Sequence, residues 1–210
     1  LSAGIFNGIL RRLVIASRDH TGSGGQIGSM VIGSHAENHL DILGSGPVLI
    51  VGTNSGAGTG TATGTVTSGS LDESSAVTAN DNGPAILLGA GLRSSGTLTL
   101  SSGRLKITTT GSGITGGAGS STLTLNGVTL VAGAATPNFI HGLSAAQLRA
   151  GGVTFDTAGF NITVPQTLIN SGGGGVTKTG AGKLTLTGAN TYSGTTMVSG
   201  GSLALSGTGS

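Results

Sequence analysis

The chain has 210 residues, of which 43 are glycine, 8% are charged and 2% are aromatic, and its net charge is +2 at pH 7. Disordered linkers share the glycine content, but they combine low hydrophobicity with high net charge, whereas the mean hydropathy here is +0.29. The lack of cysteine excludes a disulfide framework and a thiolate metal site. No run approaches the roughly 18 apolar residues of a membrane span. The balance of nine Lys/Arg against seven Asp/Glu gives little support for an acidic partner.

Short segments of alternating apolar residues recur along the chain and predict β-strands. Each is bounded within a few residues by Gly, Ser, Asn or Asp, which form tight turns. The predicted strand cores are 13–15, 30–32, 40–42, 48–51, 64–67, 85–88, 98–100, 105–107, 123–125, 128–130, 153–155, 162–164, 184–186 and 203–205. The segment 143–150 has a helix-like composition and is expected to form one helical turn or a loop.

Strands this short are not stable as isolated hairpins, but they become stable when coils of a solenoid stack on one another. We therefore predict an all-β fold: a right-handed, single-stranded parallel β-helix of roughly nine coils, with about 20 to 25 residues per coil. Leu, Val and Ile would point inward, and Thr, Ser, Lys and Arg outward. Residues 1–210 are predicted to form one continuous β-helix segment, and the start at Leu1 without Met suggests a piece of a longer protein.

The clearest repeat spans residues 175–205, where the Leu-x-Leu strand core that begins at Leu184 recurs at Leu203. The spacing between the two cores is that of one coil of a solenoid. This segment resembles the strand repeat associated with bacterial autotransporter passengers. Residues 138–143 followed by 150–164 resemble the coil that precedes this repeat, and 95–103 and 120–127 resemble degenerate copies of it. The resemblance implies an extracellular β-helical passenger that is exported by a C-terminal outer-membrane barrel absent from these residues.

One group of potential metal ligands stands out, at His35, Glu37 and His39. Their period-two spacing would place them on one face of a strand, where they could hold a metal ion. The spacing differs from the helical zinc motif, and a polar turn between Ile32 and Leu40 is the favoured interpretation. We predict no metal site.

Catalysis by a polysaccharide-cleaving β-helix requires clustered acidic residues. Only Asp72 and Glu73 are adjacent, and neighbouring strand residues point to opposite faces, while Asp156 is expected to form a turn ahead of Gly159. The glycine runs at 22–25 and 172–175 lack the Asp of calcium-binding repeats, and Gly180–Lys183 does not match a phosphate-binding loop. The other acidic residues, which are not adjacent to one another in the sequence, are Asp19, Glu37, Asp41 and Asp81. The sequence therefore predicts no catalytic residue, no cofactor and no enzymatic activity.

The basic residues Arg11, Arg12, Arg18 and His20 form a modest cluster near the start of the chain. Nucleic-acid binders pair such clusters with stacking aromatics, and the chain has one Tyr and no Trp. A solvated or capping segment is favoured, with no nucleic-acid partner and no membrane insertion. Tyr192 is expected to pack in a turn.

These observations predict a structural stalk or scaffold of a secreted bacterial surface protein. The last coil, 202–206, carries no charge or proline to discourage strand pairing, so self-association end to end into fibres is a further expectation. An adhesin that binds glycan or matrix through the candidate loops 53–64 and 68–83 is the alternative, and a polysaccharide-acting enzyme is third.

Overall fold

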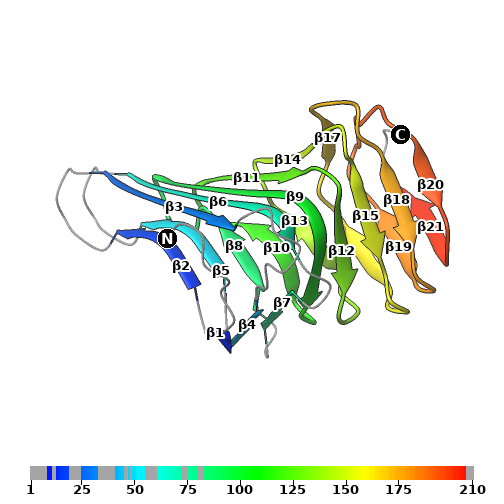
Figure 1. Cartoon of the computed structure of the whole chain (residues 1–210), viewed down its shortest axis with the longest axis horizontal. Helices are drawn as coiled ribbons and strands as arrows, with labels where there is room; N and C mark the ends of the chain where they lie inside the picture. Colours follow the sequence, from blue (N-terminus) through cyan, green and yellow to red (C-terminus); the bar gives the residue numbers. More distant parts are fainter. Residues whose placement is uncertain are drawn as a thin grey trace.

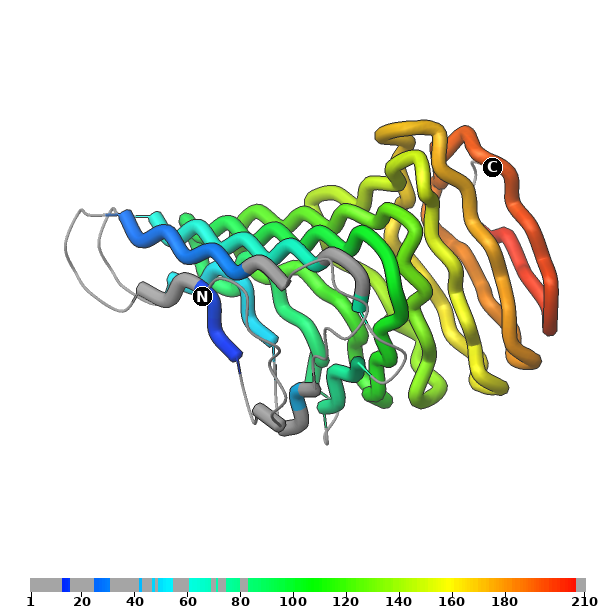
Figure 2. Tube along the Cα trace, in the orientation of Figure 1, coloured from blue at the N-terminus to red at the C-terminus, as the bar shows by residue number. Residues whose placement is uncertain are grey.

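The computed structural model describes residues 9–10, 13–18, 25–32, 41–44, 47, 49–54, 61–71, 75–79 and 83–206. The regular structure of these residues is all β-strand, with no helix among them. Strand pairing is parallel from the first ladder to the last. Successive turns of the chain stack on one another from the N-terminal to the C-terminal end (Figures 1 and 2), so the predicted parallel β-helix is confirmed.

The strands of successive coils form three faces, A, B and C, of which faces A and B continue through the last two coils. Face A follows the order β1 (Ile9–Leu10), β4 (Asp41–Gly44), β7 (Ala76–Ala79), β9 (Ser94–Thr108), β12 (Val128–Ala132), β15 (Val153–Asp156), β18 (Val176–Thr179) and β20 (Thr196–Val198). This path gives eight rungs in the described ranges, and the coil number of roughly nine stays a prediction.

Face B begins with β2 (Leu13–Arg18), β5 (Leu49–Asn54), β8 (Ile86–Leu88), β10 (Ser112–Gly116) and β13 (Asn138–His141). A bridge between Thr136 and Ile162 connects it to β16 (Ile162–Val164), β19 (Lys183–Leu186) and β21 (Ser202–Leu205). Face C consists of β3 (Gln26–Ile32), β6 (Ala62–Leu71), the first half of β9, β11 (Ser120–Leu125), β14 (Ala145–Leu148) and β17 (Leu168–Asn170). Strand β9 belongs to faces A and C, and Figure 1 shows it bending from one to the other.

The core lies between the faces and is made by period-two alternation. In β15, Val153 and Phe155 are buried while Thr154 and Asp156 are half-exposed. Phe155 lies in register with Leu130 of the preceding coil, and its ring meets Phe139 edge to face at a centroid distance of 6.3 Å. Because each coil places apolar side chains over those of its neighbour, the core is one continuous cluster along the axis.

Coils become shorter along the chain, as the residue numbers of paired positions show. Ala62 pairs with Ser94 in the first part of the rod, whereas Val153 pairs with Val176 further on. The shortest of these offsets is that between Leu184 and Leu203. It equals the spacing of the Leu-x-Leu cores that the repeat at 175–205 predicts for one coil. The expected coil length is wrong for the first coils, because strands there are long: β6 has 10 residues and β9 has 15.

Faces B and C approach each other closely in these long coils, and glycine makes the contact possible. A Cβ atom added at Gly96 of face C would collide with the Val51 carbonyl oxygen of face B, and one added at Gly64 would lie 2.5 Å from the Gly52 nitrogen. Backbone therefore packs on backbone here, which brings the two faces together as a flat slab.

The prediction of a helical turn or loop at 143–150 is wrong. Residues Ala145–Leu148 form β14, which pairs with β11 on one side and β17 on the other. Ala146 and Leu148 are buried and Gln147 points out, so parallel pairing on both sides decides the conformation over local helix propensity.

The two candidate loops are also interrupted by strands. Residues 53–54 belong to β5 and 62–64 to β6, while 68–71 end β6 and 76–79 form β7. Residues 55–60, 72–74 and 80–82 lie outside the described part of the chain. The predicted bounds of both loops are therefore wrong, since residues 53–54, 62–64, 68–71 and 76–79 belong to strands.

Candidate functional site

Most residues weighed for chemistry from the sequence fall outside the described ranges. These are His35, Glu37 and His39, the acids Asp19, Asp72, Glu73 and Asp81, and the basic residues Arg11, Arg12 and His20. Among the residues that the structure describes, no three His, Cys, Asp or Glu side chains come together as a metal site. The described residues likewise contain no helix long and apolar enough to cross a membrane.

Asp156 occupies the turn predicted for it and also forms an ion pair. Its Oδ1 accepts a hydrogen bond from the Ala158 backbone N–H at 2.9 Å, ahead of Gly159. Its Oδ2 lies 2.9 Å from Nη2 of Arg104 on β9, two coils away on face A. The carboxylate thus stabilises the turn after β15 and links β15 to β9 across face A.

Lys178 was expected to point outward with the other lysines, and this is wrong. The side chain is fully buried at an inward position of β18, in register with Phe155. The three N–H groups of its Nζ are shared among four acceptors, Thr157 Oγ1 at 3.0 Å and the carbonyl oxygens of Thr179, Gly180 and Gly200 at 2.6, 2.8 and 3.0 Å. Burial lowers the pKa of Lys178, and the charge of Asp156 partly opposes that shift. The ammonium group thus links its own coil to the preceding coil through Thr157 and to the next coil through Gly200.

His141, at the end of β13, is half-buried beside the preceding coil. Its Nε2 lies 2.9 Å from Ser112 Oγ, and burial lowers the pKa of the imidazole. Tyr192 packs against the core as expected, with its hydroxyl 2.7 Å from Thr196 Oγ1. Neither contact assembles a set of reactive groups.

Outward hydroxyl side chains form rows across face C. Thr65, Thr97 and Thr122 occupy one row, and Thr67, Thr99 and Thr124 the next. Adjacent strands lie about 4.8 Å apart and alternate residues about 6.6 Å apart, so the rows make a regular polar surface. This arrangement confirms the predicted outward position of threonine on this face for all of these residues except Thr124, which is buried.

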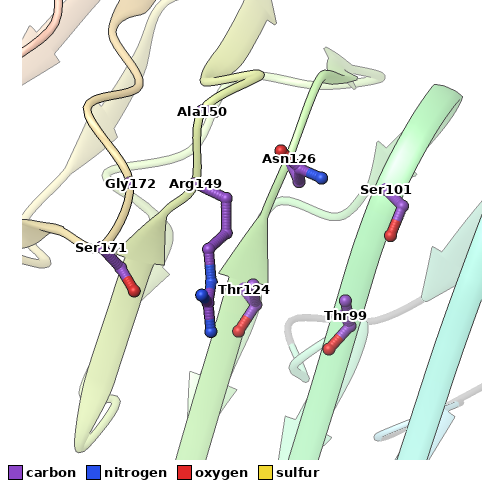
Figure 3. A pocket seen from close by; sticks show the side chains of 8 residues that line it. All are labelled: Thr99, Ser101, Thr124, Asn126, Arg149, Ala150, Ser171 and Gly172. Atoms are coloured by element: carbon purple, nitrogen blue, oxygen red, sulfur yellow. The ribbon is translucent and has the colours of Figure 1, made fainter.

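An open hollow of about 520 Å³ lies at one edge of this surface (Figure 3). Its lining comes from four successive coils: Thr99, Ser101, Thr124, Asn126, Arg149, Ala150, Ser171 and Gly172. Backbone hydrogen bonds set the alignment, because Asn126 N donates to Leu100 O, Arg149 N to Leu125 O and Ser171 N to Leu148 O, each at 2.9 Å. These bonds extend the parallel ladder beyond the strand ends, so Ser101, Asn126, Arg149 and Ser171 follow one another across the coils.

The electrostatics of the hollow are set by Arg149. Its side chain is exposed and extends alongside Thr124 in Figure 3. None of the lining residues is acidic, and within the described part of the chain the guanidinium has no ion-pair or hydrogen-bond partner. Asn126 is fixed, since its Oδ1 accepts a hydrogen bond from Gly151 N at 2.9 Å, which leaves its amide N–H groups available. The sequence does not predict this site. The only sequence signal for these residues is that they lie at or just after the ends of successive face C strands.

The fold is that of a parallel β-helix protein with a polar outer surface on face C. Comparison with known proteins adds two similarities to this fold class. A family model described as passenger-associated-transport-repeat matches residues 176–205. The chain is also 41% identical over 106 residues to the adhesin BmaC autotransporter of Brucella suis biovar 1 (strain 1330), an alignment that covers 48% of this chain and 3% of that protein. No solved structure matches the chain.

The two matches support the predicted resemblance to an autotransporter passenger with strand repeats, at the cell surface or secreted. The matched repeat contains β18, β19, β20 and β21. It therefore coincides with the C-terminal coils, in which Leu184 of β19 pairs with Leu203 of β21. The chain spans only a small part of the length of its relative.

Proposed function

We propose that the chain is a structural, non-catalytic stalk or scaffold within an extracellular passenger, continuous over residues 1–210 and exported through the outer-membrane barrel of the same precursor. The observation that carries the proposal is the succession of parallel rungs on face A from β1 to β20. In such a solenoid each coil is stabilised mainly by its neighbours, so a stiff rod can have any length.

The rod is tested by electron microscopy and small-angle X-ray scattering of the full chain. We expect an elongated particle whose length corresponds to about 4.8 Å per coil. A compact, isotropic particle would contradict the proposal, and so would hydrolysis of a polysaccharide by the purified chain.

The last described coil supplies the proposed means of fibre assembly. β20 and β21 each pair on one side only among the described strands, and Val198 and Leu205 are 49% and 48% exposed although their positions align with the buried side chains of Lys178 and Leu186. When the segment is isolated, pairing with a coil of a second copy would bury these side chains and satisfy the open strand edges. The contact is heterologous, and repetition of it gives a filament.

A single charged residue at this edge tests the assembly. Leu205→Lys places an ammonium group where the next coil would pack, so we expect concentration-dependent association in sedimentation velocity to be lost. The matched control is Leu92→Lys, because Leu92 is 73% exposed and lies in a turn before β9. Equal association of the wild type and both variants would rule out this end of the rod as the contact.

The second proposed function is that of an adhesin that binds glycan or matrix, and the similarity to an autotransporter adhesin favours it. Residues 68–83 include β7, which pairs with β4 and β9. Glycan-array binding by the full chain that is lost on deletion of 68–83, with the β-sheet circular dichroism retained, would support these residues as the contact.

A further inference from the structure

The hollow on face C combines one unpaired cation with several uncharged hydrogen-bonding groups. Arg149 is the only charged residue in its lining. A guanidinium presents a rigid fork of N–H donors that matches the two oxygens of a carboxylate. The hollow thus has one point of recognition for a planar anion rather than a diffuse basic surface.

The groups around Arg149 are those that bind sugar hydroxyls. Ser101, Ser171 and Thr99 present hydroxyls with no hydrogen-bond partner within the described chain, and Asn126 keeps its amide donors free. Hydroxyls donate and accept, whereas the amide donates, so together they complement the mixed donors and acceptors of a pyranose ring. A polyphosphate would require several cations, and a nucleic acid stacking aromatics; the lining has neither.

The shape fits a segment of a polymer. Ser101, Asn126, Arg149 and Ser171 lie on four successive coils, so the row extends about 14 Å at the spacing of parallel strands. The hollow is open at the surface of face C, and the labelled side chains follow one another across the strands (Figure 3), so a polymer segment along this row would cross the four coils.

We propose that this hollow binds a carboxylated sugar unit of an acidic polysaccharide, with the uronate carboxylate on Arg149 and the ring hydroxyls on Asn126 and the serine and threonine side chains. The proposal rests on the adhesin function and specifies its ligand class and its site. It assigns the contact to the wall of the rod rather than to residues 68–83 or to the end coil.

The test uses the full chain and oligogalacturonate, which carries a carboxylate on each sugar and no sulfate. Its fully methyl-esterified form is the matched neutral ligand, and dextran sulfate tests for attraction to any polyanion. Saturation-transfer-difference NMR titrations are run for the wild type, Arg149→Ala, Arg149→Lys and Lys183→Ala. Lys183 is an exposed cation on face B, so its substitution makes the same change in net charge away from the hollow.

We expect the wild type and Lys183→Ala to bind oligogalacturonate alike, and Arg149→Ala to bind it at least about tenfold more weakly. Arg149→Lys keeps the charge but loses the fork, so an intermediate affinity is expected. The methyl ester should bind as weakly to the wild type as the acid binds to Arg149→Ala. Circular dichroism checks that each variant keeps its β-sheet signal.

Equal binding by the wild type and Arg149→Ala would overturn the proposed site. A preference for dextran sulfate, or equal losses in Arg149→Ala and Lys183→Ala, would overturn the ligand class in favour of unspecific charge attraction. Absence of oligogalacturonate binding would also overturn the proposal, and glycan-array binding that depends on residues 68–83 would then leave the adhesin function standing. The imaging and sedimentation experiments test the rod independently.

Discussion

The coils between residues 49 and 125 and those between 153 and 205 use the same alternation of inward and outward residues but enclose different interiors. In the first region, Gly64 and Gly96 occupy inward positions and the backbones of faces B and C touch. In the second, Phe155 and Lys178 point inward and fill the space between the faces. The coils of the second region are also shorter, as the pairing of Leu184 with Leu203 shows when set beside that of Ala62 with Ser94.

The comparison separates two roles of the sequence. Alternation decides which residues face inward, and the size of those residues decides how far apart the faces lie. Glycine at an inward position permits a flat slab, whereas an aromatic side chain holds the faces apart. A coil with more residues therefore does not imply a thicker rod, because the additional residues in the first region belong to long extended strands such as β9.

Truncation of the C-terminal core should have the largest effect. Phe155→Ala removes a ring that is fully buried and contacts Phe139, so we expect the free energy of unfolding to fall by about 3–5 kcal/mol. In the slab, Val66→Ala removes less volume and should lower it by about 1.5 kcal/mol. Urea denaturation measures both, and equal losses would contradict the distinction between a filled and a flat interior.

Substitution of Lys178 tests whether the filled interior depends on its polar contact. Lys178→Met keeps the length of the side chain but withdraws the donor from Thr157 and three carbonyl oxygens. Since unsatisfied buried acceptors are costly, we expect a loss of about 2–4 kcal/mol. Hydrogen exchange should locate the loss in the C-terminal coils; an unchanged or higher stability would show that apolar filling alone suffices.

A methyl group between the faces tests the slab. Gly96→Ala places a Cβ atom against backbone atoms of Val51 and Gly89 that have no rotamer with which to move away, and we expect a loss of about 1–3 kcal/mol from overpacking. The control Gly25→Ala meets only Thr61, at 3.4 Å and beyond, and should stay within about 0.5 kcal/mol of the wild type. Comparable thermal unfolding of the two variants would argue against close backbone packing.

The pH dependence of stability is expected to show the smallest effect. Burial lowers the pKa of Lys178 in the folded chain, so between that lowered pKa and the ordinary lysine value only the unfolded chain holds the proton. Unfolding takes up a proton in this window, and stability therefore increases as the pH rises through it and decreases as the pH falls. Urea titrations at alkaline pH should show this slope in the wild type.

Two variants check the assignment of that slope. Lys178→Met should abolish it, because the titrating group is gone. Asp156→Asn should move the lower limit of the window to lower pH, because the Asp156 charge raises the pKa of Lys178. A slope that persists in Lys178→Met would belong to another group.

Much of the fold was predictable because inward and outward residues alternate within short segments. The register of Leu184 with Leu203 could be read directly from the recurrence of the Leu-x-Leu core. The strand at Ala145–Leu148 could not, since alanine, glutamine and leucine all favour helices and only the neighbouring strands determine the conformation.

The candidate site was less accessible from the sequence. The position of Lys178 follows the alternation with Val176, but its charge predicts an outward side chain; the carbonyl of Gly200 that helps to hold it comes from the next coil. The hollow is composed of residues from 99 to 172. Their proximity depends on coils of changing length, and no spacing within a single segment reveals it.

The one-to-one pairing of each coil with the next has a consequence for how such proteins change during evolution. Duplication or loss of a whole coil by recombination leaves every remaining inward side chain inward and every rung paired, because pairing repeats from coil to coil. A gain or loss of one residue within a strand would instead exchange the two sides of that strand. Length can therefore vary in units of a coil while the alternation of inward and outward residues is kept.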